Sequence, residues 1–206
     1  MRPMADVTYS QTAIKILSTA KRLFMQRGYR AVSINDIVQA AEITKPTLYY
    51  HFADKDELFT QMALHTLAEM HQRMDAAIEG IHETAGRLVA LAEVAMNASD
   101  GDTRMMRHQI REHLGPAQQA RIAVAFQQQM VEPLRQVMEE GVARGELSRR
   151  DPGELAWLYL SFIEGFHREP EPALESEYGS PIVVAHFPIP ALIDLFLHGV
   201  APRDQS

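Results

Sequence analysis

The chain has 206 residues, 46% of them hydrophobic and 23% charged, which is the composition of an ordinary globular protein. It contains no cysteine, so disulfides, thiolate metal sites and cysteine nucleophiles are excluded. The formal net charge of −7 argues at first against nucleic acid as a partner. The sequence has neither the apolar core of a signal peptide nor a run of about 18 apolar residues for a membrane span, which predicts a soluble, cytoplasmic protein with no membrane partner.

The charges are unevenly distributed along the chain. Residues 1–59 carry eight Lys and Arg against six Asp and Glu, a net of +2, and include all four lysines. Residues 60–206 carry 12 against 21, a net of −9. Because the distribution of charge matters more for nucleic-acid binding than its sum, this asymmetry predicts two parts with different partners.

The pattern of the first part predicts three short helices. The segment TAIKILSTAKRLFMQRG, residues 12–28, repeats apolar residues at helical spacing and ends at Gly28, a residue suited to a helix C-terminus. In SINDIVQAA, residues 33–41, Ser33 is the expected N-cap and Asp36 stands at capping-box spacing. A third helix is expected to start at Thr44 after only a few residues. Two short helices joined by so tight a turn predict a helix-turn-helix at about 33–52.

The remainder of the chain is also predicted to be helical. A long helix should start after Asp54, because apolar residues recur in steps of four and three from Ala63 to Ile81. Further helices are predicted at about 84–98, 103–114, 116–144, 152–168 and 189–199. Pro133 should kink or split the third of these, since proline removes a backbone donor and clashes with the preceding turn. The Pro- and Glu-rich stretch at about 169–188 is predicted to be a loop, and the fold class is all-α.

TKPTLYYHFADK, residues 44–55, places basic and aromatic side chains on one short helix. A recognition helix projects side chains toward base edges while neighbouring groups hold phosphates. Lys45 can donate to guanine acceptors, and the methyl group of Thr47 can pack on a thymine methyl. Leu48 and Phe52 are four residues apart and should face inward. The residues predicted to bind DNA are Ser33, Thr44, Lys45, Pro46, Thr47, Tyr49, Tyr50, His51 and Lys55.

The segment SINDIVQAAEITKPTLYYHFADKDEL, residues 33–58, resembles the DNA-binding segment of the TetR family of transcriptional regulators. The resemblance extends from about Ser10 to Met70. Its most specific part is a helix and a tight turn followed by Thr-x-x-Thr-Leu-Tyr-x-His-Phe-x-x-Lys-x-x-Leu. The resemblance implies that Thr44, Lys45, Thr47, Tyr49 and His51 face DNA and that Lys55 lies near a phosphate.

The resemblance also implies a domain organisation. After a tail of residues 1–9, an N-terminal three-helix domain at 10–70 would carry the helix-turn-helix. A larger C-terminal helical domain at 71–206 would bind a small molecule and dimerise. The chain departs from the family in the turn, where Glu42 stands in place of the usual glycine. If that position needs a positive φ, glutamate costs about 1 kcal/mol there and places a negative charge near DNA.

Methionines and histidines are the main candidates for an effector pocket. Each methionine by itself is expected to fill the core, but together they suit a pocket that adapts to a mainly apolar small molecule. The histidine pairs His65/His71 and His108/His113 are spaced six and five residues apart, which does not place two metal ligands on one helical face, so no metal site is predicted. The predicted pocket residues are Met62, His65, Met70, Met74, Met106, His108, Arg111, Met130, Tyr159 and Phe162.

The last two predicted helices have broad apolar faces. One subunit could bury both faces, but their width also suits a contact between subunits. The resemblance implies that this helix pair forms a four-helix bundle across a two-fold axis. The predicted interface residues are Leu155, Leu158, Phe162, Phe166, Leu192 and Phe196.

The leading hypothesis is therefore a homodimeric, ligand-responsive repressor that binds a pseudo-palindromic DNA duplex, with no catalytic residue and no cofactor. A helical hydrolase is an alternative, but the sequence shows no nucleophile elbow, phosphate loop or metal-spaced His and Glu set. An architectural DNA-binding protein is another, although such proteins rely on broad phosphate neutralisation and this chain is acidic overall.

Overall fold

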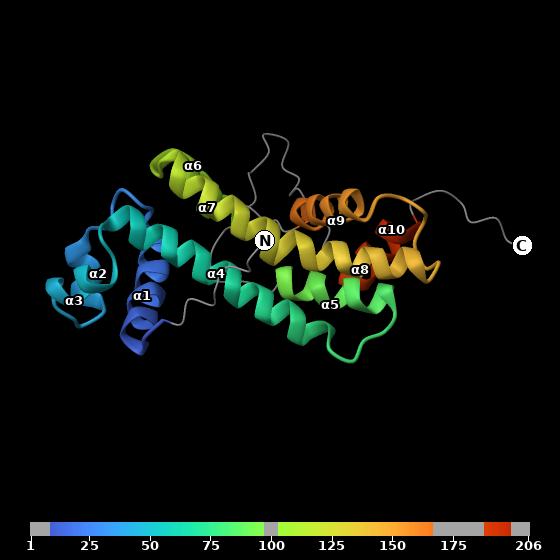
Figure 1. Cartoon of the computed structure of the whole chain (residues 1–206), viewed down its shortest axis with the longest axis horizontal. Helices are drawn as coiled ribbons and strands as arrows, with labels where there is room; N and C mark the ends of the chain where they lie inside the picture. Colours follow the sequence, from blue (N-terminus) through green and yellow to red (C-terminus); the bar gives the residue numbers. More distant parts are fainter. Residues whose placement is uncertain (1–8, 97–102, 167–187, 199–206) are drawn as a thin grey trace, which may run out of the picture. The chain divides into compact units, whose positions relative to one another are not determined.

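The computed structural model describes residues 9–96, 103–166 and 188–198, and the regular elements in these ranges are all helical (Figure 1). They are α1 (Gln11–Arg27), α2 (Ile34–Ala40), α3 (Lys45–His51), α4 (Lys55–Ile78), α5 (Thr84–Met96), α6 (Thr103–His113), α7 (Pro116–Phe126), a π-helical turn (Gln127–Val131), α8 (Glu132–Ala143), α9 (Pro152–Phe166) and α10 (Ile189–His198). The all-α prediction is thus confirmed. Among the helices of the described ranges, none has the length and apolar character that crossing a membrane requires.

The chain forms two compact units. The described part of the first unit consists of residues 9–69 and 103–127, and that of the second consists of 70–96, 128–166 and 188–198. The first unit therefore includes α6 and α7 as well as the N-terminal helices. It is larger than the 10–70 segment inferred from the sequence, whose role as the complete DNA-binding domain stays a prediction.

Local sequence signals account for the ends of the first three helices. The Ser10 hydroxyl accepts a hydrogen bond from the Ala13 amide at 3.2 Å at the start of α1. The helix ends before Gly28, whose φ of 78° no β-carbon obstructs. At α2, Ser33 and Asp36 form the predicted capping box. Thr44 caps α3 by accepting from the Thr47 amide, so the helix-turn-helix at 33–52 forms from residues that specify its boundaries.

The turn between α2 and α3 contains Glu42, which stands where the resembled family usually has glycine. Glu42 has a φ of 52°, and among the described non-glycine residues no other φ is positive. In this region the β-carbon of an L-residue crowds the backbone, which costs about 1–2 kcal/mol. The Glu42 carboxylate lies 3.7 Å from the Lys15 ammonium on α1, but both side chains are exposed, so this ion pair offsets little of the cost.

Glu42→Gly is expected to raise the free energy of unfolding by about 0.5–1 kcal/mol, because relief of the strained φ outweighs the greater flexibility of glycine in the unfolded chain. Operator affinity should also rise, since a negative charge next to α3 is removed. Urea denaturation and a DNA titration measure the two effects. Glu42→Ala is the matched control, because it removes the charge and keeps the strain. A glycine variant less stable than the wild type would contradict this account.

The core of the first unit joins six helices, and α2 takes part through the buried Ile37. Phe24 of α1 and Phe59 of α4 are fully buried and meet edge to face, with ring centroids 5.0 Å apart. Leu48 brings α3 into the same cluster, and it is completely buried. Leu114 and Ile122 add the end of α6 and the face of α7. The position of α3 thus depends on a core that residues beyond position 70 help to fill.

The core of the second unit lies between α5, α8, α9 and α10. Tyr159 of α9 is 2% exposed, and its hydroxyl donates to the Leu88 carbonyl of α5 at 2.6 Å. The long helix predicted at 116–144 is split as expected, because a π-helical turn precedes Pro133 in the first turn of α8. Of the loop predicted at 169–188, all but Pro188 lies outside the described residues.

Candidate nucleic-acid interface

Helix α3 is anchored on one side and open on the other. Leu48 is fully buried and Phe52 is 2% exposed, which confirms their predicted inward orientation. Lys45 and Pro46 in the first turn are exposed. Tyr49 is 50% exposed and its neighbour Tyr50 is 85% exposed, so neither tyrosine is a core residue. The helix therefore offers a cation and two phenol groups to a partner while its buried side holds it in place.

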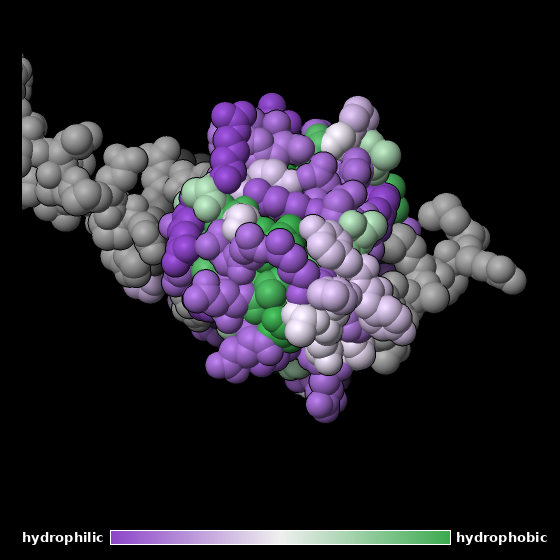
Figure 2. Space-filling view, turned by 90° about the vertical axis from the view of Figure 1, so that its left-hand side faces the viewer, coloured by the Kyte–Doolittle hydropathy of each residue, from purple (hydrophilic) through white to green (hydrophobic). Residues whose placement is uncertain are grey.

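Figure 2 shows the end of the molecule that carries α2 and α3, where hydrophilic residues cover most of the surface and a small hydrophobic area lies near the centre. This composition suits a DNA backbone and base edges better than it suits an apolar partner.

The hydroxyl groups of Ser33 and Thr44 already serve the helix-turn-helix. Ser33 accepts from the Asp36 amide at 3.2 Å and donates to the Asp36 carboxylate. The Thr44 and Thr47 hydroxyls lie 2.8 Å apart, and Thr44 also caps α3. Ser33 and Thr44 remain exposed, so a contact with DNA would use their second hydrogen-bonding positions.

The last turn of α3 lies beside the start of α1. The rings of Tyr50 and His51 meet edge to face at 5.0 Å, and His51 is half-buried. An open hollow of about 400 Å³ lies here, lined by Tyr9, Ser10, Ala13, Tyr50, His51, Phe52 and Gln61. The sequence did not indicate that the start of α1 approaches α3, because the two are about 40 residues apart in the chain.

The sequence predicted that Lys55 lies near a DNA phosphate, but its ammonium also contacts Tyr29 within the protein. Its ammonium donates to the Tyr29 carbonyl at 2.6 Å and lies 4.1 Å from the centre of the Tyr29 ring. Burial lowers the pKa of Lys55, although nearby carboxylates oppose the effect. Lys55 is thus not an ordinary solvated lysine. Its contact with a DNA phosphate stays a prediction, and its contacts within the protein add a structural role.

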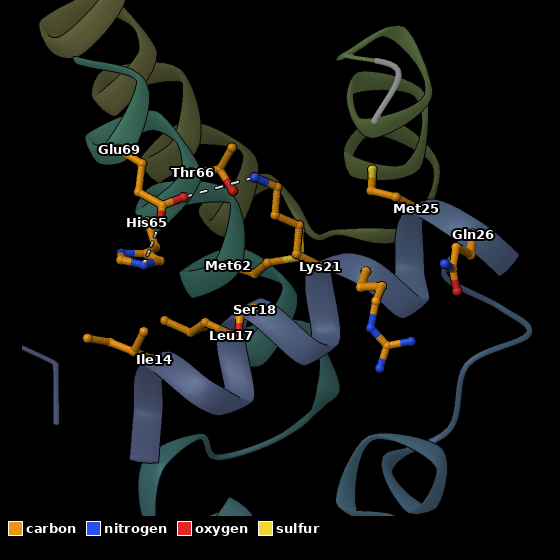
Figure 3. Close-up of a pocket in the computed structure, with 11 residues that line it drawn as sticks. Ile14, Leu17, Ser18, Lys21, Met25, Gln26, Met62, His65, Thr66 and Glu69 are labelled. Carbon is orange, nitrogen blue, oxygen red and sulfur yellow. Dashed lines mark ion pairs between the residues drawn. The ribbon is translucent and has the colours of Figure 1, made fainter. Parts of the chain in front are cut away.

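The predicted pocket residues are divided between the two units. Met62 and His65 line an open groove of about 550 Å³ between α1 and α4 in the first unit, where Glu69 pairs with both His65 and Lys21 (Figure 3). The first unit also contains Met106, His108 and Arg111; the second contains Met70, Met74, Met130, Tyr159 and Phe162. The groove thus brings only two of the ten predicted residues together.

The side chains of several predicted pocket residues already have partners within the protein. His108 is exposed on α6, and its ring lies 3.0 Å from the Glu112 carboxylate. Tyr159 is a core residue with a satisfied hydroxyl, which corrects its assignment as a polar group open to a ligand. Phe162 is half-buried, with its ring 5.6 Å from that of Phe196. In the described ranges, no group of three or more His, Asp or Glu residues is arranged to hold a metal ion.

The predicted interface residues also need a correction. Leu155 is 8% exposed and Leu192 is 1% exposed, so both pack inside the second unit and cannot form an exposed face. Leu158 is 56% exposed, as an interface residue should be, and the adjacent Trp157 is 49% exposed. The sequence analysis did not include Trp157, because it assigned a single apolar stripe of the helix to the subunit interface. In the structure, much of that stripe packs inside the subunit, and Trp157 lies outside the stripe. The side chain of Phe166 lies outside the described residues.

Comparisons with known proteins agree with this geometry. The family model described as bacterial regulatory proteins of the tetR family matches residues 16–62, a range that contains all nine predicted DNA-binding residues. The chain is 25% identical to the uncharacterized HTH-type transcriptional regulator YhgD of Bacillus subtilis (strain 168), over 79% of this chain and 87% of that relative. It is 46% identical to the HTH-type transcriptional regulator QacR of Staphylococcus aureus over 48 residues, which cover 23% of this chain and 26% of QacR.

The same fold occurs in solved structures. One is AibR in complex with isovaleryl coenzyme A and operator DNA, which matches with a TM-score of 0.63 and 19% identity over 91% of this chain and 96% of AibR. The helix-turn-helix with an exposed α3, the family match over that segment and the regulators found among the relatives all agree. Residues 16–62 therefore match the bacterial regulatory proteins of the tetR family, and over most of its length the chain is similar to a transcriptional regulator.

Proposed function

We propose that the protein is a homodimeric repressor that leaves a pseudo-palindromic operator when it binds a small, mainly apolar effector. The observation that carries the DNA-binding part is the geometry of α3. Its first turn and its tyrosines are exposed, while Leu48 and Phe52 hold it in the core. Lys45 is suited to guanine acceptors and the tyrosine hydroxyls to phosphate oxygens. No catalytic role is assigned to any residue, and the compartment of this DNA-binding protein is the cytoplasm.

Two recognition helices are needed for a specific complex of this kind. One helix of seven residues contacts only a few base pairs, so specificity requires a second copy on a half-site about one helical turn, ~34–36 Å, or more away. The exposed apolar residues Trp157 and Leu158 of α9 support a surface for the second copy.

The effector acts by binding the DNA-competent and DNA-incompetent states with different affinities. Helix α4 would link the effector-binding site to the DNA-binding helix. It is one continuous helix of 24 residues, and its first turn follows α3 closely. Met62 of this helix lines the open groove beside α1 in the first unit, and its flexible thioether side chain supports an apolar effector. The solved structure of AibR with an acyl coenzyme A thioester and operator DNA is a precedent in this fold for both ligands.

The proposal is tested by selecting duplexes from a random pool over repeated rounds of binding. The selected sequence should contain two inverted half-sites, and affinity for it should exceed that for a scrambled duplex by at least about a thousandfold. Equal affinity for the two duplexes would favour an architectural DNA-binding protein instead. Apolar acyl compounds and polar sugars are then titrated against the complex. Release by sugars alone would overturn the apolar effector.

Lys45 and Lys55 should respond differently to alanine substitution. Lys45→Ala should change the preferred base at one position of each half-site and leave stability unchanged, because Lys45 is exposed. Lys55→Ala should weaken binding on all sequences and reduce the salt slope by about one phosphate contact per subunit. It should also lower the melting temperature, because the bond to the Tyr29 carbonyl is lost. A change in base preference caused by Lys55→Ala would contradict its assignment to phosphate.

A further inference from the structure

Tyr29 lies in the segment between α1 and α2 and packs against α1, α4 and α6; Tyr29 and the groups that contact it are called the Tyr29 corner below. Its ring is 9% exposed. It stacks on Phe24 of α1 at 5.6 Å and on His113 of α6 at 4.9 Å, while Phe59 of α4 meets it edge-on at 5.2 Å. Tyr29, which lies just before the helix-turn-helix, is thus enclosed by Phe24 of the preceding helix and by Phe59 and His113, which are distant in sequence.

All three polar groups of Tyr29 have partners. Its amide donates to the Gln109 side-chain oxygen of α6 at 2.8 Å, across 80 residues of sequence. Its carbonyl accepts from the Lys55 ammonium, and its hydroxyl donates to the Asp56 carboxylate. Burial, together with this hydrogen bond, raises the pKa of the Tyr29 hydroxyl, which keeps it protonated as a donor. The corner therefore connects α6 to the first turn of α4.

Gln109 lies directly on this corner. A β-carbon added at Gly28 would lie 3.3 Å from the Gln109 side-chain nitrogen, so the glycine leaves the space that Gln109 occupies. A second contact lies nearby, where the Arg30 guanidinium is 3.1 Å from the Glu112 carboxylate, but both side chains are substantially exposed. Gln109 is half-buried and supplies the acceptor that the Tyr29 amide uses, which makes it the more important of the two contacts.

The contacts of Tyr29 with Lys55 and Asp56 help to fix the position of the first turn of α4. Lys55 follows His51, the last residue of α3, by only four positions, so a shift of that turn reaches α3 through a short, tightly packed segment. The same turn is held from α7, where the Arg121 guanidinium donates two hydrogen bonds to Glu57 at 2.7 and 3.0 Å. The orientation of the DNA-reading helix thus depends on contacts from α6 and α7.

We propose that Gln109 of α6 is a positioning residue for DNA binding, which acts by holding the Tyr29 corner and, through Lys55 and Asp56, the first turn of α4. Gln109 itself contacts no DNA. This inference rests on the proposed function, because it assigns to α6 a part in the DNA-binding arrangement of α3.

Four variants of the whole chain separate positioning from general stability. Gln109→Leu keeps the size of the side chain and removes the acceptor, whereas Gln109→Glu keeps an acceptor oxygen. Ile16→Val weakens the same core from a fully buried position without touching the corner. Gln72→Leu makes the same change as the test variant at an exposed site on α4.

Native-state hydrogen exchange reports on the corner without DNA. The Tyr29 amide should exchange about tenfold faster in Gln109→Leu, because one buried hydrogen bond is lost, and should stay protected in Gln109→Glu. An equally protected Tyr29 amide in Gln109→Leu would overturn the role of Gln109 at the corner.

Binding to the selected duplex then tests the consequence for DNA. Gln109→Leu should bind about tenfold more weakly, and Gln109→Glu, Ile16→Val and Gln72→Leu should bind within about twofold of the wild type. Equal losses in Gln109→Leu and Ile16→Val, at equal melting temperatures, would mean that stability alone is responsible and would overturn the inference. Failure of the wild-type protein to bind any selected duplex would overturn the proposed function itself, whereas wild-type binding with an unaffected Gln109→Leu would overturn only this inference.

Discussion

Leu158→Glu is expected to convert the proposed dimer into folded monomers and to weaken operator binding by about a hundredfold or more. Leu158 is 56% exposed in the single subunit, so a glutamate there disturbs no core contact. In a dimer that covers Trp157 and Leu158, the same carboxylate would be desolvated without a partner, which costs several kcal/mol. A monomer contacts only one half-site of the operator, so it loses the gain in affinity that two linked DNA contacts provide.

Sedimentation analysis and a DNA titration measure the two consequences. Gln72→Glu is a suitable control, because it adds the same charge at an exposed position of α4 in the same unit. Phe196→Glu would be a poorer test, since Phe196 also packs on Tyr159 at 5.5 Å within the subunit. If Leu158→Glu remained a stable dimer at micromolar concentration, the interface would have to lie elsewhere.

Leu48→Ala is expected to lower the free energy of unfolding by about 2–5 kcal/mol and to abolish specific DNA binding. Leu48 is fully buried and is the main anchor of α3, so its truncation leaves a cavity beneath the recognition helix. A helix of seven residues has too few internal hydrogen bonds to stay ordered without that anchor.

Urea denaturation and titration with the selected duplex test this expectation. Tyr50→Ala, on the same helix but 85% exposed, is the matched control. It should change stability by less than about 0.5 kcal/mol and still weaken DNA binding, because only the contacting side of α3 is altered. Specific binding by Leu48→Ala at wild-type affinity would show that α3 does not read the operator.

The boundaries of the helix-turn-helix were predictable because their causes are local. The Ser33 and Asp36 capping box, the Thr44 cap and the Asp54 cap each join residues three positions apart, so the sequence contains both partners of every bond. The positive φ of Glu42 was anticipated for a different reason, namely the resemblance to the TetR family, which usually has glycine at that position of the turn.

The burial of the C-terminal helices could not be predicted with the same success. The helical periodicity of apolar residues shows that an apolar stripe exists. It does not show whether the stripe packs inside the subunit or against a second subunit. The fold buries Leu155 and Leu192 and leaves Trp157 and Leu158 exposed. Which apolar residues become buried depends on which neighbouring helices cover each side of the helix. The spacing of apolar residues within one helix does not contain this information.

The sequence by itself determined that the described segments are helical, where the caps around α3 lie and which side chains α3 exposes. Only the tertiary structure decided that α6 and α7 belong to the unit that carries α3, that Tyr29 receives contacts from Gln109 and His113, and that the Lys55 ammonium faces the Tyr29 carbonyl. The physical reason is the range of the interactions. Caps and helical periodicity act over three or four residues, whereas these packing contacts join side chains about 25 to 85 positions apart, and their pairing is set by which helix faces meet.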